Sequence, residues 1–174
     1  MPPSPLRRAW SVVPLRSRVA GVDADTLRQW LADLPPPVGY GVSARPLRYR
    51  LAPHLAAFCW YEDHLIELQV PEPFRAWDEK VYVRARRKPG RRLAFQWFSQ
   101  TVRFRTRREV LRFLYLHEFY HWYLREVRGR KAAAETACDR FALAHFRAQN
   151  RNVDWSSVLP GYAPVARRPL KPAA

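Results

Sequence analysis

His117-Glu118-Phe119-Tyr120-His121 is the stretch of this sequence that says most about its fold and chemistry. Two histidines four residues apart lie on the same face of a helix, where both imidazoles can reach one zinc ion. Glu118 then lies beside the metal rather than on it, and its carboxylate can take a proton from water. The alternative is a helix with two hydrogen-bonded histidines and a solvated glutamate. Apolar residues surround the motif, so burying these polar side chains without a metal would be costly.

The helix that carries this motif is predicted to begin near Thr106. Thr106 can cap the helix, and Glu109 occupies the capping-box position three residues later. An apolar pattern with a period of 3.6 residues continues to Val127, and Gly129 is typical of a helix end. A second helix is predicted over residues 131–149. The two helices run antiparallel if the chain reverses near Gly129.

A catalytic zinc site needs a third protein ligand, and the second helix offers one. His121 lies eight residues before Gly129, and Glu135 lies six residues after it. At about 1.5 Å per residue these depths are about 12 and 9 Å, within one helical turn of each other. We therefore predict Glu135 as the third ligand, together with His117 and His121. Asp139 can accept the remaining N–H of a liganding histidine; the alternative is that Asp139 binds the metal and Glu135 is a surface charge.

This pattern resembles the Glu-zincin arrangement of metallopeptidases. HEFYH (117–121) is followed by ETACDRFALA (135–144), which is similar to the E-x-x-x-(N/D)-x-F-A helix of ImmA/IrrE-type metallopeptidases. The resemblance covers residues 106–146 and implies a zincin-like fold, one zinc ion and Glu135 as a ligand. The family commonly has glycine where Tyr120 stands. SprT-type proteases, which combine HExxH with DNA association, are the second choice, since their third ligand is typically a histidine.

Upstream of the motif the apolar pattern alternates with a period of two, which predicts strands. Residues 55–61 and 64–70 form a predicted hairpin, and residues 81–87 and 93–98 form a second, basic one. In a zincin-like fold an edge strand binds the substrate backbone, and residues 64–70 fit such a strand. The predicted class is therefore α+β: a twisted, mostly antiparallel sheet with an N-terminal helix and two C-terminal metal-binding helices.

The domain prediction places a single zincin-like domain at residues 21–149, with the basic hairpin as an insertion at about 80–105. Residues 1–20 are basic and interrupted by prolines, which indicates a flexible arm, and residues 150–174 read as a Pro-rich C-terminal tail. No apolar run approaches the ~20 residues of a membrane span, and two cysteines make no disulfide framework. We expect a cytoplasmic protein without a membrane partner; its oligomeric state stays open.

The second chemical signal is positive charge. The net charge is +16 over 174 residues, and nearly all of the excess is arginine, which suits either a polyanionic partner or the codon usage of a GC-rich genome. Ten basic residues and no acid lie between Arg84 and Arg108, interleaved with Phe95, Trp97, Phe98 and Phe104. The candidate nucleic-acid contacts are Arg84, Arg86, Arg87, Lys88, Arg91 and Arg92. In the alternative interpretation the aromatic rings face the core and the arginines form a solvated outer face.

Together these features predict a zinc-dependent peptidase that acts on a protein or peptide substrate, with Glu118 as general base. A further group should stabilise the oxyanion, and Tyr162 and His64 are candidates. The rival hypothesis is a basic nucleic-acid-binding module on a zincin-like scaffold, without peptidase turnover.

Overall fold

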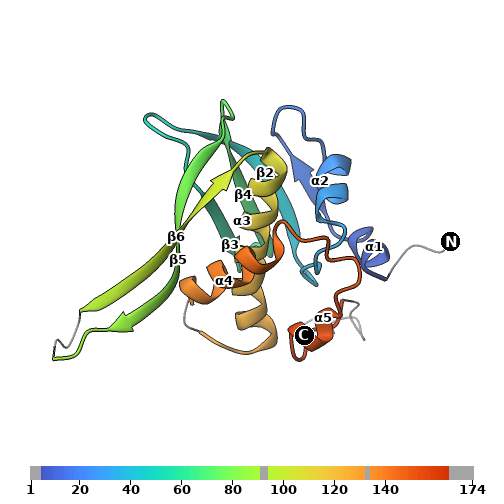
Figure 1. Ribbon diagram of the computed structural model, residues 1–174. Coiled ribbons are helices and arrows are strands. Elements are labelled where there is room, and N and C mark those ends of the chain that lie inside the picture. Colours follow the sequence, from blue (N-terminus) through green and yellow to red (C-terminus); the bar gives the residue numbers. More distant parts are fainter. Residues whose placement is uncertain (1–4, 91–93, 132–133, 165–174) are drawn as a thin grey trace.

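The computed structural model describes residues 5–90, 94–131 and 134–164 of the chain. Within these ranges the protein is of mixed α+β class, with two sheets and several helices (Figure 1). In chain order the elements are α1 (Pro5–Trp10), β1 (Leu15–Ser17), α2 (Ala24–Leu31), β2 (Gly41–Arg48), β3 (Ala56–Trp60), β4 (Leu65–Glu72), β5 (Trp77–Arg87), β6 (Phe95–Phe104), α3 (Arg107–Trp122), the π-helical segment η1 (Tyr123–Val127), α4 (Glu135–His145) and α5 (Trp155–Val158).

The four-stranded sheet has the strand order β1-β2-β4-β3, and two of its three pairings are parallel. The expectation of a mostly antiparallel sheet is therefore wrong for this sheet, although β5 and β6 form a separate antiparallel pair. Parallel neighbours need a crossover connection between them. The chain passes through α2 between β1 and β2, and through β3 between β2 and β4.

The edge of this sheet is not where the sequence suggested. Residues 64–70 fall largely in β4, which is hydrogen-bonded to strands on both sides and lies inside the sheet. The edge strand beside β4 is β3, which pairs only with β4 within the described residues; the strand at the opposite edge of the sheet is β1. The predicted hairpin is confirmed as β3 and β4. The strand with a free outer edge is β3, the first of the two, and not the second as predicted.

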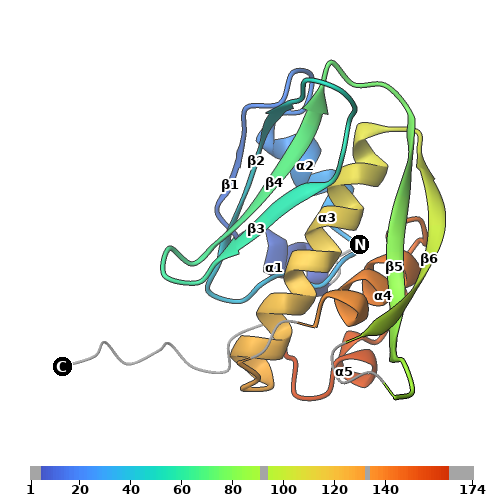
Figure 2. The ribbon, with the colours of Figure 1, turned by 90° about the vertical axis from the view of Figure 1, so that its left-hand side faces the viewer.

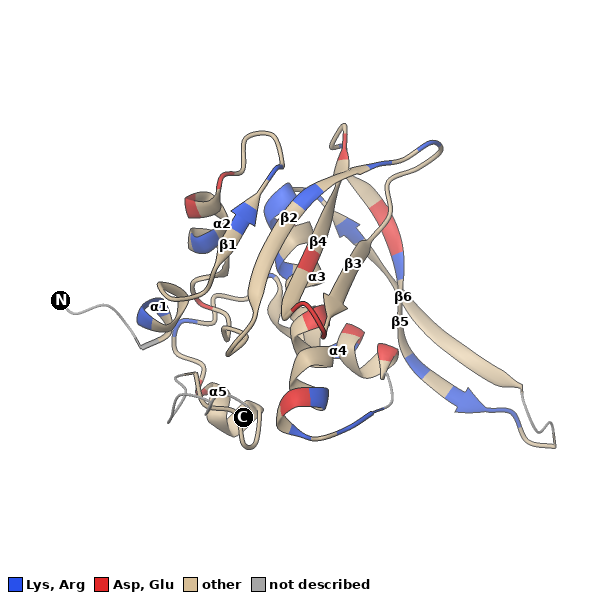
Figure 3. Ribbon diagram, turned by 180° about the vertical axis from the view of Figure 1, so that it is seen from behind, with Lys and Arg blue, Asp and Glu red and all other residues tan. Residues whose placement is uncertain are grey.

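The core lies between the sheet and α3. Val42, Ala44, Ile66 and Leu68 alternate with less buried neighbours along β2 and β4, so one face of the sheet is apolar and buried. Figure 2 shows α3 between this sheet and the β5–β6 hairpin, and from behind the sheet lies in front of α3 (Figure 3). Both layers therefore cover the helix that carries the histidine motif, which explains why it is apolar on several sides.

The N-terminal segment is part of this domain. The prediction of a flexible arm over residues 1–20 is wrong for residues 5–20, which form α1 and add β1 to the sheet. Trp10 is fully buried, and its indole N–H donates a hydrogen bond to the Leu34 carbonyl oxygen at 2.9 Å. Its burial outweighs the basic, Pro-rich composition that suggested an arm.

The C-terminal segment also packs on the domain as far as it is described. Trp155, Leu159 and Tyr162 are buried, so residues 150–164 belong to the core rather than to a separate tail. The backbone N–H of Asn150 donates to the Asp33 carboxylate at 2.9 Å. Residues 165–174 of the predicted tail lie outside the described residues.

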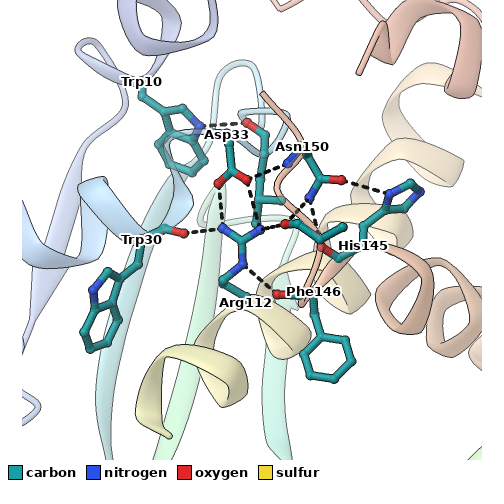
Figure 4. Close-up of polar contacts among 9 residues, drawn as sticks. Trp10, Trp30, Asp33, Arg112, His145, Phe146 and Asn150 are labelled. Atoms are coloured by element: carbon teal, nitrogen blue, oxygen red, sulfur yellow. Dashed lines mark hydrogen bonds and ion pairs between the residues drawn. The ribbon is translucent and has the colours of Figure 1, made fainter. Parts of the chain in front are cut away.

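A buried ion pair fixes the position of α4 relative to α3 (Figure 4). Arg112 of α3 is 2% exposed, and its guanidinium contacts Asp33 at 2.6 and 3.1 Å. The same guanidinium donates to the carbonyl oxygens of Trp30, Phe146 and Ala148 at 2.6 to 2.9 Å. Because Phe146 and Ala148 follow α4 directly, this network ties the end of α4 to the helix that carries the motif.

The basic hairpin consists of two long strands, β5 and β6, and projects from the domain (Figure 1). Its inner half is anchored by Trp77, Val81, Val102 and Phe104, which are buried. A register shift after Tyr82 marks a bulge in β5, and α4 packs against this strand. The insertion predicted at about 80–105 therefore covers nearly all of this hairpin, which begins three residues earlier, at Trp77.

Candidate metal centre

The helix that carries both histidines begins as the sequence predicts. The Thr106 hydroxyl accepts a hydrogen bond from the Glu109 N–H at 3.1 Å, and the Glu109 carboxylate accepts one from the Arg105 N–H at 2.7 Å. After Trp122 the helix widens into one π-helical turn, and Gly129, with a φ of 63°, ends it. His117 and His121 therefore lie near the end of a capped, buried helix.

The predicted ligand atoms lie together between α3 and α4. The Nε2 atoms of His117 and His121 are 3.1 Å apart. The Glu135 carboxylate lies 3.2 Å from the Nε2 of His117 and 3.3 Å from that of His121. Two imidazoles and a carboxylate from neighbouring helices thus converge on one point, as the antiparallel helix argument predicts.

These spacings fit a tetrahedral metal ion. Bonds of about 2.0–2.1 Å in tetrahedral geometry separate neighbouring ligand atoms by about 3.3–3.4 Å. The two imidazole nitrogens are 3.1 Å apart, close to this range. Glu135 contacts His117 through Oε2 and His121 through Oε1, so its carboxylate lies beside both nitrogens, and either oxygen could complete the ligand set.

Asp139 lies on the other side of the His117 ring. Its carboxylate is 2.8 Å from the Nδ1 of His117, so the ring donates from Nδ1, and its Nε2 faces His121 and Glu135. This contact favours Glu135 over Asp139 as the third ligand. Asp139 takes the orienting role that the sequence assigned to it.

Cys138 is a further residue of this cluster that sequence analysis did not assign to the metal. Ligand atoms of His117, His121 and Cys138 all lie within 4.8 Å of one another, so this group could also hold a metal ion. Burial and the nearby carboxylates, Glu135 first, raise the pKa of the Cys138 thiol. A thiol loses its proton when it binds a metal, so Cys138 and Glu135 are both candidates for the third ligand.

The charges of the cluster are coupled. Burial acts to lower the pKa of His117, but hydrogen bonds to Asp139 and Glu135 outweigh it and raise the pKa to about 9. Burial and the neighbouring His117 lower the pKa of His121. The hydrogen bond from His117 lowers the pKa of Glu135, whose carboxylate therefore stays ionised. The protonated imidazole of His117 is stabilised by these two carboxylates, one at each of its ring nitrogens.

Glu118 occupies the position beside the cluster. It is 7% exposed, and burial raises the pKa of its carboxyl to about 7, against the opposing effects of His117 and the Cys59 backbone N–H. A carboxyl group with a pKa near neutrality can both accept and return a proton at physiological pH.

A cavity of about 580 Å³ opens onto these residues. The edge strand β3 forms one wall, and His117, Glu118 and His121 form another. Tyr61 supplies the one phenolic hydroxyl among the described residues that line the cavity, and the Arg125 guanidinium lies 3.9 Å above its ring. Sequence analysis missed Tyr61 because its place in the cavity depends on long-range strand pairing.

The two residues suggested as oxyanion stabilisers lie elsewhere. Tyr162 is buried, and its hydroxyl donates to the Pro36 carbonyl oxygen at 2.8 Å. His64 lines a separate cavity against Tyr40. Neither residue is among those that line the cavity at the histidine motif, so both suggestions are wrong.

None of the described basic residues of the hairpin lines the cavity at the histidine motif. Arg84, Arg86, Arg87 and Lys88 are exposed on the projecting half of β5 and just beyond it (Figure 3). Arg91 and Arg92 lie outside the described residues. Of the four interleaved aromatic residues only Phe104 is buried, and Phe95, Trp97 and Phe98 are exposed.

No helix in the described part of the chain is both long and apolar enough to span a bilayer. Comparisons with protein-family models, with curated proteins and with solved structures give no match to this chain. Its function is therefore inferred from the geometry and chemistry of the metal centre itself.

Proposed function

We propose that the protein is a zinc-dependent metallopeptidase with a zincin-like fold that hydrolyses peptide bonds of a protein substrate. The observation that carries this proposal is the convergence of His117, His121 and Glu135 at 3.1 to 3.3 Å, with the buried Glu118 beside them. Two histidines and one glutamate are a recurring ligand set of catalytic zinc sites. When bound there, zinc supplies a Lewis acid that polarises a carbonyl group and makes water a better nucleophile at neutral pH.

The proton transfers fall to Glu118. Its carboxylate accepts a proton from the attacking water and passes it to the nitrogen of the leaving amine. The raised pKa of Glu118, about 7, suits both steps because the group can gain and lose a proton near neutral pH. Asp139 keeps the Nδ1 proton on His117, so that Nε2 of the same ring stays available as a ligand.

Substrate binding is assigned to the free edge of β3. An extended peptide can add to a sheet edge through main-chain hydrogen bonds, and β3 borders the cavity that holds the metal residues. A peptide on this edge lies across Glu118. Tyr61 is then the hydroxyl that can donate a hydrogen bond to the oxygen of the reacting carbonyl, since it lines the same cavity.

Metal content and turnover test the proposal together. Purified protein should carry about one zinc ion, measured by mass spectrometry of the metal. His121→Ala should lose it, whereas Glu118→Gln should keep it. A quenched-fluorescence library of random peptides then measures hydrolysis. Glu118→Gln should lower kcat by about 10² or more.

Two results contradict this assignment. Full zinc loading of His121→Ala would show that the metal binds elsewhere. Hydrolysis by Glu118→Gln at the wild-type rate would remove this residue from the reaction. Inactivity of the zinc-loaded wild type on every peptide, together with salt-sensitive binding of nucleic acid, would favour the non-catalytic binding module.

A further inference from the structure

The outer half of the β5–β6 hairpin, which begins at the bulge after Tyr82, exposes several large aromatic side chains to solvent. Tyr82, Phe95, Trp97 and Phe98 are 45%, 44%, 56% and 39% exposed. Large aromatic side chains are usually buried, and a group of exposed ones marks an interaction site. The interpretation in which these rings face the core is therefore wrong for this half of the hairpin, whereas Phe104 of the inner half follows it.

The rings are arranged mainly on one face of the ribbon. Residues directly opposite in an antiparallel pair share a face, so Trp97 lies with Ala85, and Phe95 with Arg87. The Trp97 ring lies 6.2 Å from that of Phe95 and 6.0 Å from that of Tyr82. Trp97 therefore joins the rings of Phe95 and Tyr82 into one exposed aromatic surface.

The other face and the edge of the ribbon carry cations. Arg84 pairs with Phe98, with its guanidinium 5.9 Å from the centre of that ring, and Arg86 pairs with Gln96. No acidic residue occurs between Arg84 and Arg108, so no carboxylate within this segment offsets these charges. The acidic residues of β5, Asp78 and Glu79, belong to its inner half (Figure 3).

We propose that the outer half of the β5–β6 hairpin binds single-stranded nucleic acid. Bases stack on the rings of Phe95 and Trp97, and the phosphates lie against Arg87, which shares the face of these rings, and against the exposed Lys88 that follows it. Stacking needs bases whose faces are free, which favours a single strand over a duplex. The cations hold the polyanionic backbone without reading its sequence. This proposal does not depend on the peptidase activity, because the residues involved lie outside the metal cavity.

Fluorescence anisotropy of a labelled 20-nucleotide oligo-dT tests the proposal with the full-length, zinc-loaded protein. Affinity should fall as salt rises. The double variant Arg87→Ser/Lys88→Ser should reduce the slope of log K against log salt by about 1.4, because each phosphate contact to a single strand contributes about 0.7. The matched control is Arg16→Ser/Arg18→Ser at β1, which removes the same charge from another surface.

Stacking is tested by Trp97→Ala, which should weaken oligo-dT binding at least about fivefold at constant charge. Its control is Trp60→Ala on β3, a tryptophan that is 44% exposed outside the hairpin and should leave binding unchanged. Glu118→Gln should bind as the wild type does, which separates this proposal from the proposed peptidase.

Three outcomes overturn the proposal. Equal losses from the hairpin variant Arg87→Ser/Lys88→Ser and from the control Arg16→Ser/Arg18→Ser would show that only the net charge attracts the oligonucleotide. Wild-type affinity in Trp97→Ala would remove stacking. Tighter binding to a duplex of the same length, or to vesicles of anionic lipid, would assign the hairpin to a different partner. Unchanged circular dichroism and melting temperatures of the variants confirm that the loss is local.

Discussion

Replacement of Asp33 by asparagine tests how firmly α4 is held in place for the metal centre. The substitution keeps the shape of the side chain but leaves the charge of Arg112 unpaired in a site where Arg112 is 2% exposed. Loss of one partner from a buried ion pair costs about 3–5 kcal/mol. Asparagine still offers one oxygen to Arg112, so we expect about 3 kcal/mol. For a domain of this size each kcal/mol shifts Tm by about 2–4 °C, so Tm should fall by about 6–12 °C.

The matched control is Asp78→Asn. Asp78 forms an ion pair of the same type with Arg103 at 3.2 Å, but the two side chains are 53% and 54% exposed. Exposed pairs contribute about 0.5 kcal/mol, so its Tm should change by no more than about 2 °C. Thermal unfolding followed by circular dichroism compares the two variants. Equal shifts in Tm would refute the view that the buried pair holds α4 in place.

The pH dependence of Asp33→Asn follows from the same pair. Burial acts to raise the pKa of Asp33, but the hydrogen bonds from Arg112 and from the Asn150 N–H outweigh it and lower the pKa below 3.8. A carboxyl group whose pKa is lower in the folded state stabilises the fold at pH values above its pKa in the unfolded state. This stabilisation is lost as the pH falls through its pKa in the folded state. The difference in Tm between wild type and variant should therefore be full at neutral pH and shrink below about pH 4.

Three further predictions concern the site and its frame. Asp139→Asn should weaken zinc binding by about 10- to 100-fold in a chelator competition, whereas Cys138→Ser should leave it near the wild-type value; the reverse result would make the thiol the third ligand. Trp10→Ala should destabilise the protein by about 3–5 kcal/mol in urea unfolding, because Trp10 is fully buried, and an unchanged midpoint would support a flexible arm. Gly129→Ala should cost about 1–2 kcal/mol, because the φ of 63° rather than a clash is the obstacle; a thermal melt that matches the wild type would contradict this reason.

The clustering of His117, His121 and Glu135 could be predicted from sequence because it depends on local features. A spacing of four residues fixes the two histidines on one helix face, and a short turn fixes the depth of Glu135 in the next helix. The cap at Thr106 is likewise decided within four residues. Each of these features depends on helix geometry alone, which sequence spacing determines.

The rest depends on contacts between distant residues. Arg112 lies among apolar residues of α3, and its partner Asp33 lies 79 residues earlier, so no local pattern connects them. The order of the strands, and with it the free edge of β3, is set by parallel pairing across crossovers that periodicity does not encode. The exposure of Trp97 was undecided for the same reason: alternation assigns faces to a strand but does not say which face is covered.

A hydrogen bond joins the β5–β6 hairpin to α4, the helix that carries Glu135 and Asp139. The carbonyl oxygen of Val83, at the bulge of β5, accepts from Arg140 of α4 at 2.7 Å. Arg140 directly follows Asp139, the residue that orients His117. A force that bends the ribbon is therefore transmitted to α4 without passing through the sheet. Thermodynamic linkage makes this coupling reciprocal. If a ligand bound to the ribbon changes the affinity for the metal by some factor, the metal changes the affinity for that ligand by the same factor.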